Sequence, residues 1–343
     1  MGDLATRVVR WQQHQGRHDL PWQNTRDPYR VWLSEIMLQQ TQVVTVRAYY
    51  ARFLQRFPDV QHLAAAHLDE VLALWSGLGY YSRARNLHAC AVQVVREHQG
   101  QFPRSAEALQ TLPGIGRSTA AAVASICFGE RVAILDGNVK RVLTRVLGGR
   151  DDLAVAAHER ALWARATALL PTRDLVRNMP RYTQGVMDLG ATVCTARKPQ
   201  CEVCPLADLC VARREGEPHH YPVKTRKLKR SAQSLWLLWA QTRGGAVWLR
   251  QRPTPGVWAG LYCFELFDSR AALEAAVPPA YRDALHDAPV FTHVLTHKDL
   301  HLHPVRVQLP ARALHAEGAW HAAADWPRLG LPAPVRKLLE QGA

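Results

Sequence analysis

The most informative stretch of this chain spans residues 112–147 and reads LPGIGRSTAAAVASICFGERVAILDGNVKRVLTRVL. Pro113, Gly114 and Gly116 break the chain before a run of small and apolar residues, which predicts a turn and then a tightly packed helix over residues 119–127. A glycine-rich turn that leads into a helix exposes unpaired backbone N–H groups, which bind phosphate well. This half of the stretch therefore predicts an anion site.

The second half of the stretch supplies one acidic residue. A short apolar run over residues 132–135 predicts a buried segment that ends at Asp136, and the periodicity of residues 139–147 predicts a second helix. A carboxylate at a helix start faces the positive end of the helix dipole, which favours its ionised form. The alternatives are a plain packing joint between two helices and an aspartate that only caps its helix. Together, the turn and the acid favour a functional site.

Length, composition and charge limit the class of protein. The 343 residues are enough for two domains, and a hydrophobic content of 48% excludes a disordered chain. The net charge of +14 favours a polyanionic partner, and nucleic acid is the first candidate. Because no apolar run approaches transmembrane length and the first residues lack a signal core, we expect a cytoplasmic protein without membrane contact.

Four of the seven cysteines are close together. Cys194, Cys201, Cys204 and Cys210 follow a Cys-x6-Cys-x2-Cys-x5-Cys spacing, which indicates a metal site. Zinc and a [4Fe–4S] cluster both accept four cysteines, but zinc ribbons usually contain two Cys-x2-Cys pairs and this loop contains one. The spacing therefore favours the [4Fe–4S] cluster.

A single acid interrupts an apolar helix pattern near the N-terminus. Glu35 is the only charged residue within residues 31–46, and a carboxyl in such surroundings loses hydration, which raises its pKa and suits it to donating a proton. The alternative is a half-exposed glutamate on an ordinary amphipathic helix. Residues 39–42 are expected on the same helix, where the uncharged Gln40 and Thr41 could contact bases.

Two further segments carry candidate residues. Residues 75–85, WSGLGYYSRAR, predict an irregular turn in which Tyr80 offers a flat face for stacking a base, although aromatic residues that close a core are an equal alternative. A helix over residues 181–191 carries Gln184 and leads into the four-cysteine loop.

The last third of the chain has a different pattern. Residues 214–230 predict a basic linker, and period-two alternation then predicts a smaller α+β domain over residues 231–343, after a mainly α domain over residues 1–213. Four histidines between residues 293 and 303 are not expected to bind zinc, because strands would scatter them over different faces. Strands are expected over residues 234–241, 246–251, 261–266, 290–295 and 300–309, and helices over residues 271–276 and 334–339.

Taken together, the motifs resemble the MutY family of adenine DNA glycosylases, within the helix–hairpin–helix superfamily. The resemblance covers nearly the whole chain and implies two helical lobes with an iron–sulfur loop, followed by a Nudix-like lesion-recognition domain. It rests on LPW (20–22), VWLSEIMLQQTQV (31–43), GLGYYSRARNL (77–87), LPGIGRSTA (112–120), ILDGNVKRVL (134–143), MDLGATVC (187–194), the four-cysteine loop and PGVWAGLYCFE (255–265).

The resemblance implies a role for each candidate residue. Glu35 would protonate adenine as the general acid, and Asp136 would stabilise the oxocarbenium-like sugar. Asn138, Gln184 and Ser118 would line the substrate site. The implied partner is double-stranded DNA with adenine opposite 8-oxoguanine or G, bound by a monomer in the bacterial nucleoid. The implied DNA contacts are Gln40, Thr41, Tyr80, Leu112, Gly114, Gly116, Thr296 and His297.

Ser118 distinguishes between two kinds of glycosylase. Related endonuclease III-type enzymes carry a lysine in this hairpin helix that forms a Schiff base and cleaves the strand, which a hydroxyl cannot do. Ser118 therefore implies a monofunctional enzyme, although Lys140 could give weak cleavage. The alternatives are an endonuclease III-like glycosylase/lyase for oxidised pyrimidines and a non-catalytic iron–sulfur DNA sensor.

The C-terminal domain departs from its relatives in two ways. Residues 268–279 lack the carboxylate cluster with which Nudix hydrolases hold magnesium, so we expect lesion recognition without nucleotide hydrolysis. The family usually shows Phe-Ser-His in the loop that touches 8-oxoguanine, where this chain has Leu295, Thr296 and His297.

Overall fold

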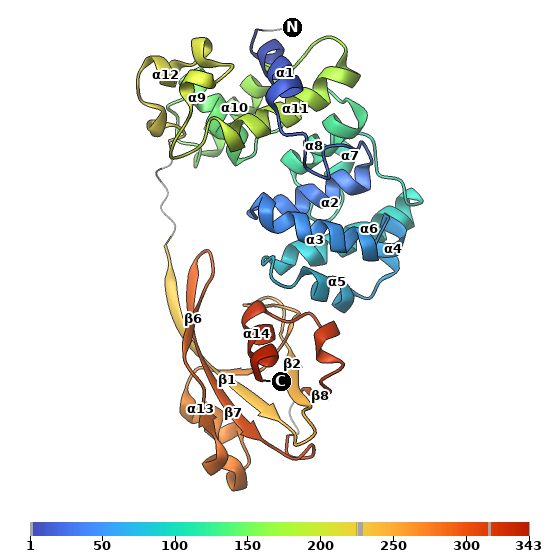
Figure 1. The fold of residues 1–343 in the computed structure, drawn as a ribbon, viewed down its shortest axis with the longest axis vertical. Coiled ribbons are helices and arrows are strands. Elements are labelled where there is room, and N and C mark those ends of the chain that lie inside the picture. Colours follow the sequence, from blue (N-terminus) through green and yellow to red (C-terminus); the bar gives the residue numbers. More distant parts are fainter. Residues whose placement is uncertain (1–2, 224, 226–228, 315–316, 343) are drawn as a thin grey trace. The chain divides into compact units, whose positions relative to one another are not determined.

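The computed structural model describes residues 3–223, 225, 229–314 and 317–342. The chain divides into two compact units (Figure 1). Unit 1 comprises residues 1–65 and 86–227, and unit 2 comprises residues 66–85 and 228–343. The domain boundaries expected at residues 213 and 230 remain a prediction, but residues 66–85 group with the C-terminal part of the chain.

Unit 1 is helical. Figure 1 shows its helices in two groups, one around α1, α9 and α11 and the other around α2, α3 and α8. The long apolar faces of α8 and α11 pack against each other and so join the two groups. The helices are α1 (Asp3–Gln15), α2 (Pro28–Leu38), α3 (Val43–Arg56), α4 (Val60–Ala65), most of α6 (Tyr81–His98), α7 (Ala106–Leu109), α8 (Arg117–Phe128), α9 (Gly137–Leu147), α10 (Ala156–Ala168), α11 (Leu175–Thr192) and α12 (Val211–Arg214).

The stretch over residues 112–147 folds largely as expected. Residues 119–125 of α8 are all buried, and small side chains such as Ala121 and Ala122 let this helix pack closely in the core. The apolar run before α9 has no regular secondary structure, and its residues Ala133, Ile134 and Leu135 are buried. Gly129 and Gly148 end α8 and α9 in the left-handed conformation typical of helix C-termini.

Two helix predictions require correction. Residues 39–42 do not continue the helix of Glu35, because α2 ends at Leu38 and Gln40 adopts a left-handed conformation with φ of 57°. These residues form a turn before α3. Helix α11 begins at Leu175, earlier than expected, and contains Pro180 in its first two turns.

Unit 2 contains a mixed eight-stranded sheet. The long strands β1 and β7 pair in parallel over their whole length, and the other pairs are antiparallel. The strands are β1 (Ser231–Gln241), β2 (Val247–Gln251), β3 (Tyr262–Cys263), β4 (Glu265–Phe267), β5 (His286–Asp287), β6 (Phe291–Val294), β7 (Lys298–Gln308) and β8 (Ala319–His321). The helices are α5 (Leu68–Trp75), the start of α6, α13 (Arg270–Ala276) and α14 (Ala333–Gly342).

Most of the expected strands are present. The strand expected over residues 261–266 is two short strands, because β3 pairs with β2 whereas β4 pairs with β1. Strands β5 and β8 were not expected; at two and three residues, they are too short to show a period-two pattern. The α+β character of this unit is confirmed.

Three of the basic residues of the expected linker, Lys224, Arg226 and Lys227, lie outside the described residues.

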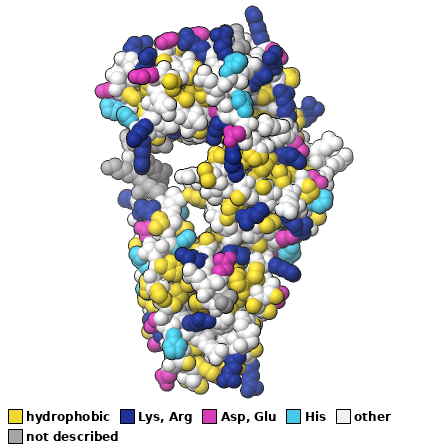
Figure 2. Space-filling model, in the orientation of Figure 1, with side chains coloured by type: hydrophobic (Ala, Val, Ile, Leu, Met, Phe, Trp, Pro, Cys, Tyr) yellow, Lys and Arg dark blue, Asp and Glu magenta, His cyan; other side chains and the backbone are white. Residues whose placement is uncertain are grey.

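Figure 2 shows many Lys and Arg side chains on the face in view. Among the described residues, no helix has both the length and the apolar character needed to cross a membrane.

Candidate active site

Glu35 and Asp136 line the same cavity in unit 1. Glu35 comes from the last turn of α2, and Asp136 is the N-cap of α9. The cavity has a volume of about 820 Å³, which is large enough for a nucleoside. Predicted residues that also line it are Gln40, Thr41, Ser118, Asn138 and Gln184.

The surroundings of Glu35 suit a proton donor. Glu35 is half-buried at the cavity, and its neighbours on α2, Ser34, Ile36 and Met37, are buried. Loss of hydration and, to a smaller extent, the negative charge of Asp136 together raise the pKa of Glu35 to about 7. Near neutral pH, a substantial fraction of the carboxyl therefore carries a proton.

Asp136 is held by the start of its own helix. Its Oδ1 accepts a hydrogen bond of 2.7 Å from the backbone N–H of Val139. Burial nevertheless raises the pKa of Asp136 above its ordinary value, and the backbone donors and the charges of Arg141 and Lys140 only oppose this rise. The helix start therefore favours the charged form, as expected, but does not outweigh burial.

The predicted hairpin turn lies between α7 and α8. Gly114 has φ of 73°, and a Cβ at this position would lie 2.6 Å from Cβ of Asn86, so α6 approaches the turn too closely for a side chain. Gly116 is the N-cap of α8 and supplies no side-chain acceptor to the first backbone N–H groups of this helix. Leu112 is buried and anchors the turn. This geometry can bind an anion.

Neither residue considered for Schiff-base chemistry presents an amine to the cavity. Ser118 lines the cavity, and its Oγ accepts a hydrogen bond of 3.3 Å from the backbone N–H of Leu135. Lys140 does not line the cavity, and its Nζ lies 2.5 Å from Oε1 of Glu159. The ion pair holds the amine beside Glu159.

A buried carboxylate that had no predicted role orients Gln184. Asp188 is fully buried, and its Oδ1 accepts a hydrogen bond of 2.9 Å from Nε2 of Gln184. Arg17 compensates the charge of Asp188, with Nη2 at 2.6 Å and Nε at 2.8 Å from Oδ1. The amide nitrogen of Gln184 is thereby fixed. Arg17 was missed because an isolated arginine in a loop carries no sequence signal.

Arg141 was also missed, and it orients Asn138. Its Nη2 donates hydrogen bonds to Oδ1 of Asn138 at 2.9 Å and to the backbone oxygen of Gly190 at 2.6 Å. Its Nε donates to the backbone oxygen of Cys194 at 2.8 Å. Arg141 therefore links the cavity to the first cysteine of the loop. The three-residue spacing from Asn138 on one helix is the only sequence signal for this contact.

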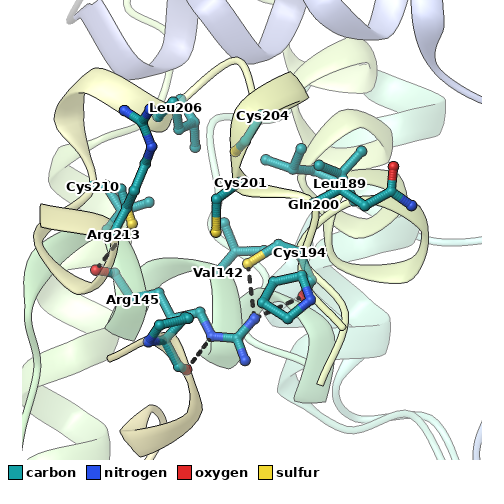
Figure 3. Close-up of a pocket in the computed structure, with 15 residues that line it drawn as sticks. Val142, Arg145, Leu189, Cys194, Gln200, Cys201, Cys204, Leu206, Cys210 and Arg213 are labelled. Carbon is teal, nitrogen blue, oxygen red and sulfur yellow. Dashed lines mark hydrogen bonds between the residues drawn. The ribbon is translucent and has the colours of Figure 1, made fainter. Parts of the chain in front are cut away.

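The four cysteines line a second cavity in unit 1 (Figure 3). Arg145 is almost completely buried beside them, and its Nη1 lies 3.3 Å from Sγ of Cys194. Its guanidinium also donates to the backbone oxygens of Cys194, Thr195 and Pro218. A buried cation beside thiolates favours a negatively charged sulfur-ligated group.

The donor set of this cavity fits an iron–sulfur cluster. No three His, Cys, Asp or Glu side chains in the described part of the chain are placed to hold a single metal ion. Four sulfurs around a shared cavity instead suit a multinuclear group, which needs four separated thiolates. Without a metal, burial raises the pKa of Cys204 to about 11, so the thiolates need positive compensation.

Unit 2 brings together the predicted residues Tyr80 and Thr296. The hydroxyl of Tyr80 is hydrogen-bonded to Oγ1 of Thr296. Both side chains are exposed, as is that of His297. Arg230 donates to the backbone oxygen of Thr296 at 2.9 Å, which adds a positive charge to this group. Two segments that are far apart in the chain thus form one polar surface.

Comparison with known protein families agrees with this geometry. Residues 33–166 match the HhH-GPD superfamily of base excision DNA repair proteins, and residues 235–341 match a NUDIX domain. Residues 194–210 match the iron–sulfur binding domain of endonuclease III. The predicted fold class and the [4Fe–4S] cluster are thereby confirmed.

An adenine DNA glycosylase of Buchnera aphidicola subsp. Acyrthosiphon pisum is 35% identical over 340 residues, covering 97% of this chain and 95% of that protein. The chain belongs to the adenine DNA glycosylase family. The human adenine DNA glycosylase is 47% identical over 213 residues, covering 59% of this chain and 38% of the human protein.

Solved structures of other proteins support the fold of this chain. A thermostable thymine-DNA glycosylase is similar with a TM-score of 0.54 and 30% identity, covering 62% of this chain and 95% of that one. The endonuclease III of a non-covalent endonuclease III–DNA complex is similar with a TM-score of 0.50 and 23% identity, covering 62% of this chain and 94% of that one. The second likeness shows the fold alone.

Proposed function

We propose that this chain is a monofunctional glycosylase that hydrolyses the N-glycosidic bond of adenine opposite 8-oxoguanine or G in duplex DNA. The observation that carries the proposal is the position of Glu35 and Asp136 on one nucleoside-sized cavity. The membership of the family supports adenine as the excised base. The excess of basic residues supports DNA as the polymer.

The target adenine must leave the base stack before it can enter the cavity. Gln40 and Thr41 belong to the turn at its rim and would fill the gap that the base leaves. The left-handed backbone of Gln40 supports this role, because strained conformations of non-glycine residues concentrate at functional sites. The backbone N–H groups at Gly116 would bind a phosphate of the same duplex.

Cleavage would use the two carboxyl groups in different protonation states. Glu35 gives its proton to the adenine ring, and the bond between the base and C1′ then breaks with its electrons on the leaving base. Asp136 in its charged form stabilises the positive charge that develops on the sugar. Water then attacks C1′ and gives a proton to the Glu35 carboxylate, which leaves an abasic site and free adenine.

The neighbours of the two carboxyl groups would orient the substrate. Gln184, fixed by Asp188, presents its amide to the base, and Asn138, fixed by Arg141, is close to the sugar site. A hydroxyl at Ser118 cannot form a Schiff base, and the pairing of Lys140 with Glu159 supports the absence of strong lyase activity. The [4Fe–4S] cluster on Cys194, Cys201, Cys204 and Cys210 would stabilise the loop that contacts Arg141 and Arg145.

Unit 2 would recognise the opposing base. Tyr80 offers an aromatic face for stacking, and Thr296 and His297 offer hydrogen-bonding groups to an oxidised guanine. The hydroxyl of Thr296 would serve the purpose that a serine serves in related proteins. We further propose that the chain acts as a monomer at the bacterial nucleoid.

The test is the excision rate under single-turnover conditions on three duplexes. They carry adenine opposite 8-oxoguanine, adenine opposite G, or an oxidised pyrimidine. We expect cleavage after alkali on the first two, with the first faster, and none on the third. Preferred excision of the oxidised pyrimidine, or strand cleavage without alkali, would instead indicate an endonuclease III-like enzyme.

The pH dependence of excision follows from the two carboxyl groups. Glu35 must be protonated, so the single-turnover rate should fall as pH rises through about 7, the pKa of its carboxyl. Asp136 must be charged, so the rate should also fall in acid, at a pH above the ordinary pKa of an aspartate because burial raises it. A rate that stays constant between pH 6 and 9 would contradict the role of Glu35.

A further inference from the structure

The segment that carries Tyr80 packs within unit 2. Residues 66–85 lie between two parts of unit 1 in the sequence but belong to the unit of the C-terminal sheet. Helix α5 packs on the short helix Trp326–Arg328. A Cβ at Gly330 would lie only 2.5 Å from Cβ of Leu72, so the backbone before α14 approaches α5 directly.

Arg336 of α14 fixes one end of the loop over residues 76–81. Its Nε donates a hydrogen bond of 3.0 Å to Oγ of Ser76, and its Nη2 donates to the backbone oxygen of Leu329 at 3.0 Å. The same guanidinium donates to the backbone oxygen of Pro327 at 3.3 Å. One charged side chain therefore joins the loop to the segment that precedes α14.

The backbone oxygen of Leu331 accepts a hydrogen bond from each end of the same loop. Oγ of Ser76 donates to it at 3.2 Å, and the hydroxyl of Tyr81 donates at 3.0 Å. Both ends of the loop are therefore tied to the start of α14. Tyr80, directly before Tyr81, is the residue between these ties that exposes a side chain; Gly77, which is also exposed, has none.

Tyr80 needs such support because of its backbone. Its φ is 49°, a conformation that residues with a side chain adopt only when their surroundings enforce it. Within the loop, Arg83 donates to the backbone oxygens of Leu78 and Gly79 at 3.2 Å, and its guanidinium lies 5.3 Å from the ring centre of Tyr80. Arg83 thus holds the backbone at Leu78 and Gly79, and Arg336 holds the loop at Ser76.

We infer that Arg336 is a positioning residue for discrimination of the base opposite adenine. It acts through the loop over residues 76–81, which presents Tyr80 beside Thr296, and it touches neither the DNA nor the reacting atoms. The inference rests on the proposed function, because it assumes that Tyr80 and Thr296 contact the opposing base. Helix α14, the last element of the chain, is thereby part of the recognition apparatus.

The test compares Arg336→Met with Lys337→Met in the full-length protein loaded with its cluster. Lys337 is the adjacent residue on α14 and is exposed, so its replacement removes the same charge without the loop contacts. Single-turnover excision rates are measured for adenine opposite 8-oxoguanine and opposite G. We expect Arg336→Met to lower the ratio of the two rates by about tenfold, the effect of losing hydrogen bonds from a charged group.

Further variants separate positioning from a general loss of structure. The rate opposite G should stay within about twofold of the wild-type rate, because the two carboxyl groups belong to unit 1. Arg336→Lys should restore part of the ratio, since an ammonium can reach some of the same acceptors. If Arg336→Met does not fold, Ser76→Ala carries the same test, because it removes the hydroxyl that contacts both Arg336 and Leu331.

The outcomes separate this inference from the proposed function. A wild-type protein that does not excise adenine would overturn the proposed function, and one that excises it without preference for 8-oxoguanine would overturn the recognition role of unit 2 and this inference with it. A wild-type preference that survives in both Arg336→Met and Ser76→Ala would overturn the inference alone. A ratio that falls equally in Lys337→Met would show that charge near the DNA matters and that positioning of the loop does not.

Discussion

Glu35→Gln is expected to lower the single-turnover rate of adenine excision by about a thousandfold or more. The amide has nearly the same size as the carboxyl and removes the only side-chain proton that α2 can give to the base. The effect should be large because adenine is a poor leaving group unless its ring is protonated. The measurement is rapid-quench excision on a duplex with adenine opposite 8-oxoguanine.

Binding should survive this substitution. Glutamine and the protonated form of Glu35 are both neutral, so the affinity of the variant for the duplex should differ from that of the wild type by less than about threefold. Glu97→Gln is the matched control, because Glu97 is exposed on α6 and does not line the cavity. A Glu35→Gln protein with the wild-type rate would mean that another group protonates the base.

Asp136→Asn is expected to reduce the rate by about a thousandfold, through loss of the charge that stabilises the sugar in the transition state. Asparagine caps a helix as well as aspartate does, so the hydrogen bond to the backbone of Val139 and the start of α9 should persist. This substitution therefore separates the capping function of the residue from its proposed catalytic function. The excision rate and the melting temperature are measured together.

The control for Asp136→Asn is Asp27→Asn. Asp27 is the N-cap of α2, where its Oδ1 accepts from the backbone N–H of Tyr29 at 2.8 Å, and it does not line the active-site cavity. The control should keep both its melting temperature and its rate. If Asp136→Asn kept its rate while its melting temperature fell, Asp136 would be a structural cap and the two-carboxylate mechanism would be wrong.

Local features of the chain were readable without the structure because they depend on neighbouring residues. The glycines of the hairpin predicted the turn, since only that residue type accepts φ of 73° beside Asn86 without cost. The spacing of the four cysteines predicted the iron–sulfur loop, and period-two alternation predicted most strands of unit 2. The one helix that ended early, α2, ends at Leu38, and the left-handed backbone of Gln40 in the turn after it has no compositional signal.

The amino-acid sequence alone specified which residue types were present: two isolated acids, a glycine-rich turn, four clustered thiols and a change from helices to strands. The tertiary structure determined the pKa values and the orientations of the side chains. It removes hydration from Glu35 and places it near Asp136, which together bring the pKa of Glu35 to about 7, and it pairs Asp188 with Arg17 so that Gln184 is oriented. It also places Tyr80 beside Thr296. The apolar neighbours of Glu35 in the chain predicted its loss of hydration, but charge effects and hydrogen bonds between residues that are distant in the chain act through space, so no local pattern of residues encodes them.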